Sequence, residues 1–236
     1  MALPTKYGVV QPYNVQDVYQ LTRQGDWPME YDSTRKFFWA GGSLNIQTGQ
    51  TVEAANISKS YDLCGPGCLR LKSGLYYQFG ASADWALSDH DFTLAAWIRI
   101  NSFLGTYNSV LSHIVFYAGR GWALQVLSNK IQFYYTTNGS TDATVSVATT
   151  INTGTNYHIA VTRSGNLMYF FANGTLLNAG GTAFNATIYN PTTALLGIGV
   201  FATDELQNID GWVGGIELTN GRARWTADFT PPTVPY

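Results

Sequence analysis

The chain has 236 residues, a formal net charge of −2 and charged side chains at only 12% of its positions. It has no basic stripe to neutralise a phosphate backbone and no apolar run near the roughly 18 residues that cross a bilayer, which argues against nucleic-acid binding and membrane insertion. Gly, Asn, Thr, Ser and Tyr are frequent instead, and this composition favours short strands joined by turns over helices.

Residues 1–63 are interpreted as an N-terminal arm. They are rich in aromatic side chains but show no sustained strand or helix period. An aromatic segment at a terminus is expected to pack on something, and the two candidates are the chain's own folded domain and a neighbouring subunit. The residues expected to act in anchoring or assembly are Tyr7, Tyr13, Tyr19, Trp27, Phe37, Phe38 and Trp39.

Residues 64–68, CGPGC, are interpreted as a hinge turn between the arm and a domain over residues 69–236. Gly-Pro-Gly is typical of a tight turn. The lone pair of Cys64 and Cys68 is not a strong zinc or redox signature, so we expect two structural thiols, with a small disulfide loop as the alternative.

From residue 69 onward, short apolar or alternating runs recur between turn residues. The links at Ser128-Asn129 and Ser164-Gly165-Asn166 have the composition of tight hairpins, and Asn173-Gly174 is a type I′ turn signal. About ten strands with this spacing predict an all-β antiparallel sandwich or barrel. Trp97, in the run DFTLAAWIRI, is expected to fill the space between the two sheets.

Five pieces of residues 69–236 carry a resemblance to a known family. They are LRLKSGLYYQFG, DFTLAAWIRI, VLSH with GWALQVLSNKIQFYY, NTGTNYHIAVTRSGNLMYFFANGTLL and GWVGGIELTNGRARWTADFTPPTVPY. In this order they resemble the concanavalin A-like lectin/glucanase superfamily in its laminin-G-like form, which implies a jelly-roll β-sandwich. The last piece resembles the ending of laminin-G-like domains in tailed-phage virion proteins. There we expect Arg224, Trp225 and Phe229 to fold the tail back onto the sandwich.

Two positions depart from the family pattern. Tyr157 stands where the family usually has Trp before its His, and glycines follow Asp210 where the family usually has a pair of aspartates. The second departure argues against carboxylate chemistry on that strand.

The acidic residues predict no enzyme. Glycoside hydrolases on this fold need two or three carboxylates on one strand face. The glutamates are Glu30, Glu53, Glu205 and Glu217, and of these only Glu30 has an acidic residue two positions away, Asp32, which lies in the arm and outside residues 69–236. We therefore assign no catalytic residue.

Two groups of acidic residues are weak calcium candidates. Asp84 with Asp89-His90-Asp91 lies before a strand, and Asp204 with Asp210 is a second group. Acids in turns are ordinarily solvated, so no metal ligand or cofactor is assigned, and Ca²⁺ is kept as the alternative. His113 and His158 lie in apolar strands, where a core or interface histidine is expected and a ligand or pH-switch role is the alternative.

Aromatic side chains are the remaining binding signal, because sugars stack on aromatic rings while amides and carboxylates take their hydroxyls. The alternation of strands must bury about half of such residues. The candidates for glycan binding are Trp122, Tyr134, Tyr135, Trp212 and Trp225.

These observations predict a non-enzymatic structural protein of a tailed-phage virion, either a capsid decoration (cement) protein or a small tail or head-fibre component. The start of the chain has no Sec-type signal, so we expect synthesis in the host cytoplasm and display on the virion surface. The expected partners are copies of the chain, in a trimer, and the major capsid or tail protein. The alternative is a lectin module that recognises host-surface glycans.

Overall fold

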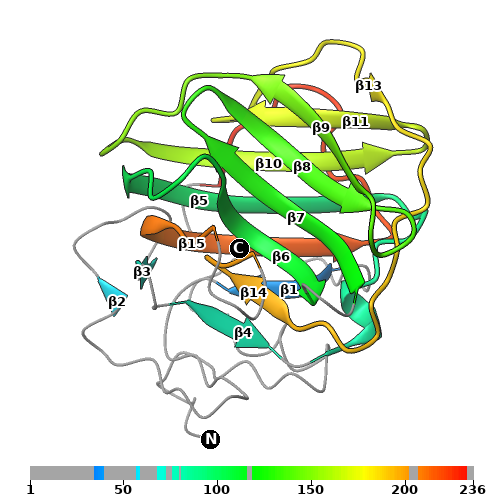
Figure 1. Cartoon of the computed structure of the whole chain (residues 1–236). Helices are drawn as coiled ribbons and strands as arrows, with labels where there is room; N and C mark the ends of the chain where they lie inside the picture. The colour runs from blue at the N-terminus through cyan, green and yellow to red at the C-terminus, as the bar shows by residue number, and fades with distance from the viewer. Residues whose placement is uncertain are drawn as a thin grey trace, which may run out of the picture.

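The computed structural model describes residues 35–39, 57–58, 68–72, 76–79, 81–115, 119–201 and 207–232. Within these ranges the chain forms two β-sheets packed face to face, and every strand pair is antiparallel (Figure 1). The predicted all-β antiparallel sandwich is confirmed.

The nine-stranded sheet has the order β12-β11-β10-β5-β15-β3-β2, with β13 beside β11 and β1 beside β15. Its strands are β1 (Arg35–Trp39), β2 (Ile57–Ser58), β3 (Cys68–Leu71), β5 (Phe92–Ser102), β10 (Asn156–Ser164), β11 (Leu167–Ala172), β12 (Thr175–Leu176), β13 (Thr182–Ala183) and β15 (Asp210–Asn220). Part of the segment interpreted as an arm therefore pairs with a strand of the sandwich, since Phe37 of β1 lies opposite Leu218 of β15.

The six-stranded sheet has the order β4-β14-β6-β7-β8-β9 and lies nearer the viewer in Figure 1. Its strands are β4 (Tyr77–Phe79), β6 (Asn108–Val115), β7 (Gly119–Leu127), β8 (Lys130–Thr136), β9 (Asp142–Ala148) and β14 (Leu196–Ile198). A single 3-10 turn, η2 (Ala83–Trp85), precedes β5 and is the one helical element in the described ranges.

The predicted hairpins occur where the turn residues stand. β7 and β8 close at Leu127 opposite Lys130, which leaves Ser128-Asn129 as the two-residue loop. β10 and β11 close at Ser164 opposite Leu167. Asn173 and Gly174 have φ of 51° and 79°, the left-handed pair that a type I′ turn requires between β11 and β12.

The core lies between the sheets and takes one face of each strand. Its largest fully buried side chains are Phe79, Phe92, Trp122, Phe133 and Phe170. In β5 the residues Leu94, Ala96 and Ile98 enter this core, so Trp97 points to the opposite face. The expectation that Trp97 fills the space between the sheets is wrong, because strand alternation gives that space to its neighbours.

The C-terminal tail covers the outer face of the nine-stranded sheet, where Ala95, Ala160 and Phe171 form a second apolar cluster. Trp225 and Phe229 pack on this cluster and stack on each other, with ring centroids 4.0 Å apart. The Trp97 indole N–H donates to the carbonyl of Pro232 at 2.9 Å. The predicted return of the tail onto the sandwich is confirmed.

An ion pair joins the same tail to β15. Glu217 of β15 is fully buried, and Arg224 donates to both of its carboxylate oxygens at 2.9 and 3.0 Å. The tail therefore covers the apolar cluster on the outer face of the nine-stranded sheet.

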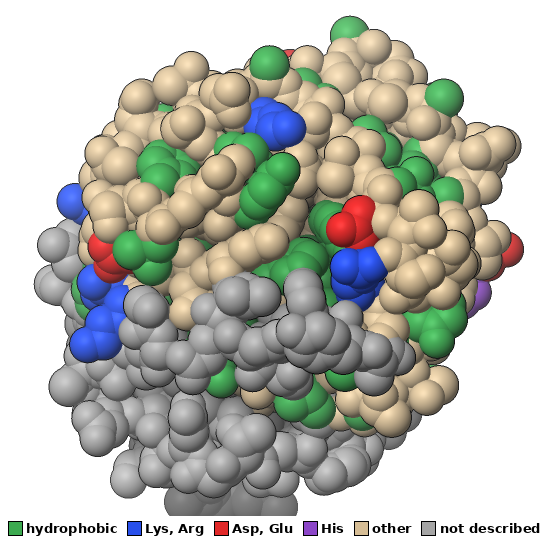
Figure 2. All heavy atoms as spheres, viewed as in Figure 1, with side chains coloured by type: hydrophobic (Ala, Val, Ile, Leu, Met, Phe, Trp, Pro, Cys, Tyr) green, Lys and Arg blue, Asp and Glu red, His purple; other side chains and the backbone are tan. Residues whose placement is uncertain are grey.

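The visible surface of the six-stranded sheet carries few charged side chains, scattered singly or in pairs (Figure 2). The described ranges contain no helix that is long and apolar enough to cross a membrane.

Candidate ligand-binding site

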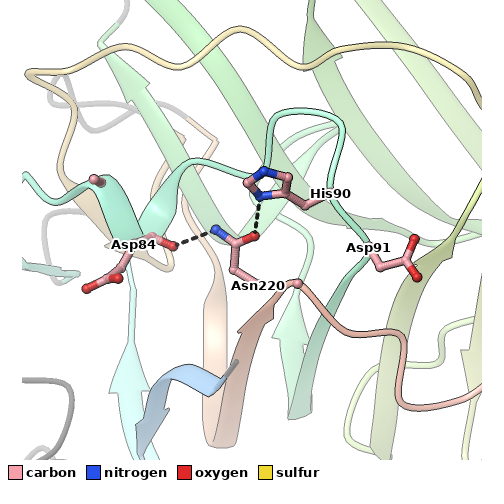
Figure 3. A pocket seen from close by; sticks show the side chains of 6 residues that line it. Asp84, His90, Asp91 and Asn220 are labelled. Atoms are coloured by element: carbon pink, nitrogen blue, oxygen red, sulfur yellow. Dashed lines mark hydrogen bonds between the residues drawn. The ribbon is translucent and has the colours of Figure 1, made fainter. Parts of the chain in front are cut away.

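A pocket of about 540 Å³ opens at one end of the sandwich (Figure 3). It lies where β5 begins and β15 ends, because Phe92 pairs with Asn220 across the two strands. Its lining residues are Ala83, Asp84, His90, Asp91, Asn220 and Gly221.

The short turn η2 forms one wall of the pocket. The hydroxyl of Ser82 caps η2 by accepting the N–H of Asp84 at 3.1 Å. Trp85 is buried, and its carbonyl accepts the indole N–H of Trp122 at 2.8 Å. The wall is thus attached to the core of the sandwich rather than to a free loop.

Asn220 connects the two walls. Its Nδ2 donates to the carbonyls of Ala86 at 2.8 Å and Asp84 at 3.3 Å, so its Oδ1 faces His90 Nδ1 at 3.0 Å. Because Asn220 offers an oxygen there, Nδ1 of His90 carries a proton and donates to it. The His90 side chain is 56% exposed, and its Nε2 lies 3.9 Å from a carboxylate oxygen of Asp89.

The two carboxylates of the lining do not form a pair. Asp84 and Asp91 point to opposite sides of Asn220 (Figure 3). Asp91 accepts the N–H of Gly165 at 2.7 Å, and Asp84 accepts the hydroxyl of Ser82 at 3.2 Å. Asp91 keeps acceptor capacity beyond its bond to Gly165, since an ionised carboxylate offers about four lone-pair positions.

The calcium candidates are only partly within the described residues. No three His, Cys, Asp or Glu residues there stand close enough together to hold a metal ion. Asp204 lies outside the described ranges. Asp210 is bound by Arg70 at 2.6 Å and by Ser102 at 2.5 Å. Burial raises the pKa of Asp210, but the bonds from Ser102 and Arg70 outweigh burial and lower that pKa below its usual value.

Three of the aromatic candidates lie on β7 and β8. Trp122 is fully buried and presents no ring face at the surface. Tyr134 is 5% exposed, and its hydroxyl donates to Asp142 at 2.5 Å. Burial, followed by Asp142, raises the pKa of Tyr134. Tyr135 points to the opposite face of β8 and packs edge-on against Phe184 on the core.

The other two aromatic candidates are half-buried and distant from these in the topology. Trp212 of β15 lies beneath the Arg70 guanidinium, whose carbon is 5.6 Å from the ring centroid. Trp225 stacks on Phe229 in the tail. The structure does not bring the five aromatic candidates together into one platform.

The assembly candidates fall at or beyond the edge of what the structure describes. Phe37, Phe38 and Trp39 form part of β1. Tyr7, Tyr13, Tyr19 and Trp27 lie outside the described residues, as does Cys64.

Asn220 is the pocket residue that sequence reasoning missed. Its signal is weak: an Asn-Gly pair at the end of an apolar run reads as a turn. Asp84, His90 and Asp91 stand close together in the sequence, whereas Asn220 joins them from the far end of the domain.

Comparison with protein families gives one match. The model described as concanavalin A-like lectin/glucanases superfamily matches residues 72–218, which is more than half of the chain. No curated protein matches the chain.

Several solved structures share the fold at low sequence identity. Domain 4 of the extracellular arabinanase AbnA from Geobacillus stearothermophilus, solved in complex with arabinotriose, has a TM-score of 0.50 and 12% identity over 66% of this chain and 72% of its own. The binding domain of Paraclostridial Mosquitocidal Protein 1 has a TM-score of 0.52 and 14% identity over 79% of this chain. Trypanosoma rangeli sialidase in complex with sialic acid has a TM-score of 0.52 and 13% identity over 82%.

The chain spans different shares of these proteins. It covers about half of the mosquitocidal binding domain, 49%, and about a third of the sialidase, 32%. At these identities the likeness shows the fold alone.

Proposed function

The chain belongs to the concanavalin A-like lectin/glucanases superfamily, and on this premise we propose that it is a non-catalytic carbohydrate-binding module. The observation that carries the proposal is the pocket between η2 and the end of β15, with the polar side chains that line it. There the exposed His90 imidazole and the carboxylates of Asp84 and Asp91 line a pocket whose η2 wall is attached to the core. Sugar hydroxyls need acceptors of this kind in fixed positions.

The charge of the pocket favours a neutral sugar. Asp84 and Asp91 line it, and its described lining contains no Lys or Arg. A carboxylate on an acidic sugar would meet like charges and no cation. Domain 4 of the arabinanase, which has this fold, was solved in complex with arabinotriose, a neutral sugar, and this supports the proposal of a neutral ligand.

The proposal of a binding module rather than a hydrolase rests on the carboxylates. Asp84 and Asp91 point apart, whereas a retaining hydrolase needs two carboxyl groups about 5 Å apart. Glu217, the one glutamate among the described residues, is fully buried and bound by Arg224 through two bonds. Incubation with neutral polysaccharides is expected to release no reducing sugar.

A glycan array carrying neutral and sialylated oligosaccharides tests the binding site. The full chain should bind neutral glycans, and His90→Ala and Asp84→Ala should each weaken that binding at least tenfold. Tyr107→Ala is the matched control, because Tyr107 is exposed in a loop outside the pocket. Binding to no neutral glycan, or equal binding by all three variants, would sink the proposal.

A second candidate function is a structural role in a tailed-phage virion, as a capsid decoration or a small tail or head-fibre component. It is favoured by the ending GWVGGIELTNGRARWTADFTPPTVPY, which resembles that of phage laminin-G-like domains. The sandwich would be displayed on the virion surface and could also bind host glycans. Antibodies against the chain should label tailed-phage particles from the same source in electron micrographs. Purified particles that carry no label would contradict this role.

A further inference from the structure

The edges of the two sheets differ in how they are protected. An open strand edge presents unpaired N–H and C=O groups, and proteins usually blunt it with a very short strand, a bulge, a Pro or a Lys. β2, β12 and β13 have two residues each, and β4 has three. β1 has a register irregularity between Arg35 and Phe37.

β9 has none of these protections. It is a regular strand of seven residues, DATVSVA, without Pro or Lys, and it pairs with β8 without a register shift. It closes the six-stranded sheet at the end opposite β4, and β8 is its one partner among the described strands (Figure 1).

The burial pattern of β9 shows that its edge is open. Asp142, Thr144, Ser146 and Ala148 are exposed. The alternate residues Ala143, Val145 and Val147 face the core but are only half-buried, and both valines pack on its margin. In β8 the core-facing neighbours Ile131 and Phe133 are fully buried.

The backbone bonds between β8 and β9 show which N–H and C=O groups of β9 are directed away from β8. Thr149 N–H donates to the Asn129 carbonyl, so this pair is hydrogen-bonded. Because hydrogen-bonded pairs alternate in an antiparallel ladder, Val147 and Val145 direct their N–H and C=O to β8. Thr144 and Ser146 therefore direct theirs outward, away from the sheet.

We propose that the β9 edge binds β9 of a second copy of this chain, antiparallel, about a two-fold axis at Val145. In this register Thr144 lies opposite Ser146 of the second copy and Asp142 lies opposite its Ala148. Every outward-directed residue of β9 then meets another outward-directed residue, and each such pair exchanges two hydrogen bonds. The pairing joins two six-stranded sheets into one continuous sheet.

The sequence of β9 is self-complementary in this register. Small hydroxyl side chains meet each other, and Val147 meets Ala143 of the second copy. The two Asp142 carboxylates lie at opposite ends of the ladder, and each is already paired with its own Arg120 at 3.2 Å. Contact about a two-fold axis uses the same strand on both copies, so it closes at a dimer.

Ser146→Pro tests the pairing in the full chain. It removes an outward N–H but leaves the ladder between β8 and β9 intact, and Pro is tolerated on an edge strand at such a position. Ser146→Ala is the matched control, because it keeps the N–H. By sedimentation velocity the wild type and Ser146→Ala should have twice the chain mass of 25.9 kDa at micromolar concentration, whereas Ser146→Pro should have the monomer mass. The dimer dissociation constant of Ser146→Pro should be at least a hundredfold higher than that of the wild type.

Amide hydrogen exchange of the wild type is the second measurement, in case Ser146→Pro does not fold. The amides of Thr144 and Ser146 should become protected as protein concentration rises, while those of Val145 and Val147 should be protected at every concentration. A wild type that stays monomeric, a trimer, or a Ser146→Pro protein that folds and remains dimeric would overturn the proposal. None of these results depends on sugar binding.

Discussion

His158 makes the fold sensitive to acid, and the effect can be predicted in size. The imidazole is fully buried on the outer face of the nine-stranded sheet, under the tail. Its ring centroid lies 5.4 Å from that of Trp97, 6.0 Å from Trp225 and 5.6 Å from Phe229. Neither ring nitrogen has a hydrogen-bond partner among the described residues.

Burial, followed by the nearby charge of Arg224, lowers the pKa of His158 to about 3 from its ordinary value of 6.5. The unfolded chain therefore takes up this proton more readily than the folded one. The stability that His158 contributes is present above pH 6.5 and is lost as pH falls from 6.5 toward 3. Between pH 8 and pH 5 the loss is about 1.36 × 1.5, or about 2 kcal/mol.

The perturbation is His158→Leu, which replaces the imidazole by an apolar side chain of similar volume that cannot take up a proton. Urea unfolding at pH 8 and at pH 5 gives the free energy of unfolding of each protein at both values. Comparing the pH-dependent change within each protein cancels the packing cost of the substitution. The decrease in the free energy of unfolding from pH 8 to pH 5 should be about 2 kcal/mol smaller in the variant than in the wild type.

His113 provides an independent check, because burial lowers its pKa to about 4. His113→Leu should reduce the pH dependence by a similar amount, and the two effects should add because the residues lie on different sheets. If His158→Leu loses as much stability on acidification as the wild type, His158 is not buried in its neutral form and the reasoning fails.

Two further predictions concern the tail. Gly174→Ala should destabilise the fold by about 2 kcal/mol more than Gly180→Ala, measured by urea unfolding. Both glycines have φ of 79°, but a Cβ at Gly174 would lie 1.9 Å from the Phe229 carbonyl oxygen and one at Gly180 would meet nothing within 4 Å; equal costs would show that the tail does not press on this turn. Arg224→Met should lower the free energy of unfolding by about 2 kcal/mol, because it removes the Arg224 guanidinium from the buried Glu217 carboxylate. The cost should be less than the roughly 3–5 kcal/mol of a fully buried ion pair, because Arg224 is 23% exposed. A melting temperature unchanged by Arg224→Met would contradict that role.

Much of the fold could be predicted from local signals. Period-two alternation, the loop at Ser128-Asn129 and the turn at Asn173-Gly174 act within a few residues, so the sequence specifies the strands and hairpins directly. The order of the five motifs also indicates the superfamily, and three of the pocket residues, Asp84, His90 and Asp91, stand together in one segment.

What the sequence by itself determined is most of the strands in residues 69–236, their turns and the sandwich they form, whereas β1 and β2 in the segment interpreted as an arm were not predicted. Only the tertiary structure decided which face of a strand is covered, because alternation separates two faces without saying what packs on each. Trp97 lies under the tail and Trp122 lies in the core for this reason, although both read as large apolar strand residues. The contact of Asn220 with His90 and the open edge of β9 were decided in the same way, since both depend on strand order, which long-range pairing sets.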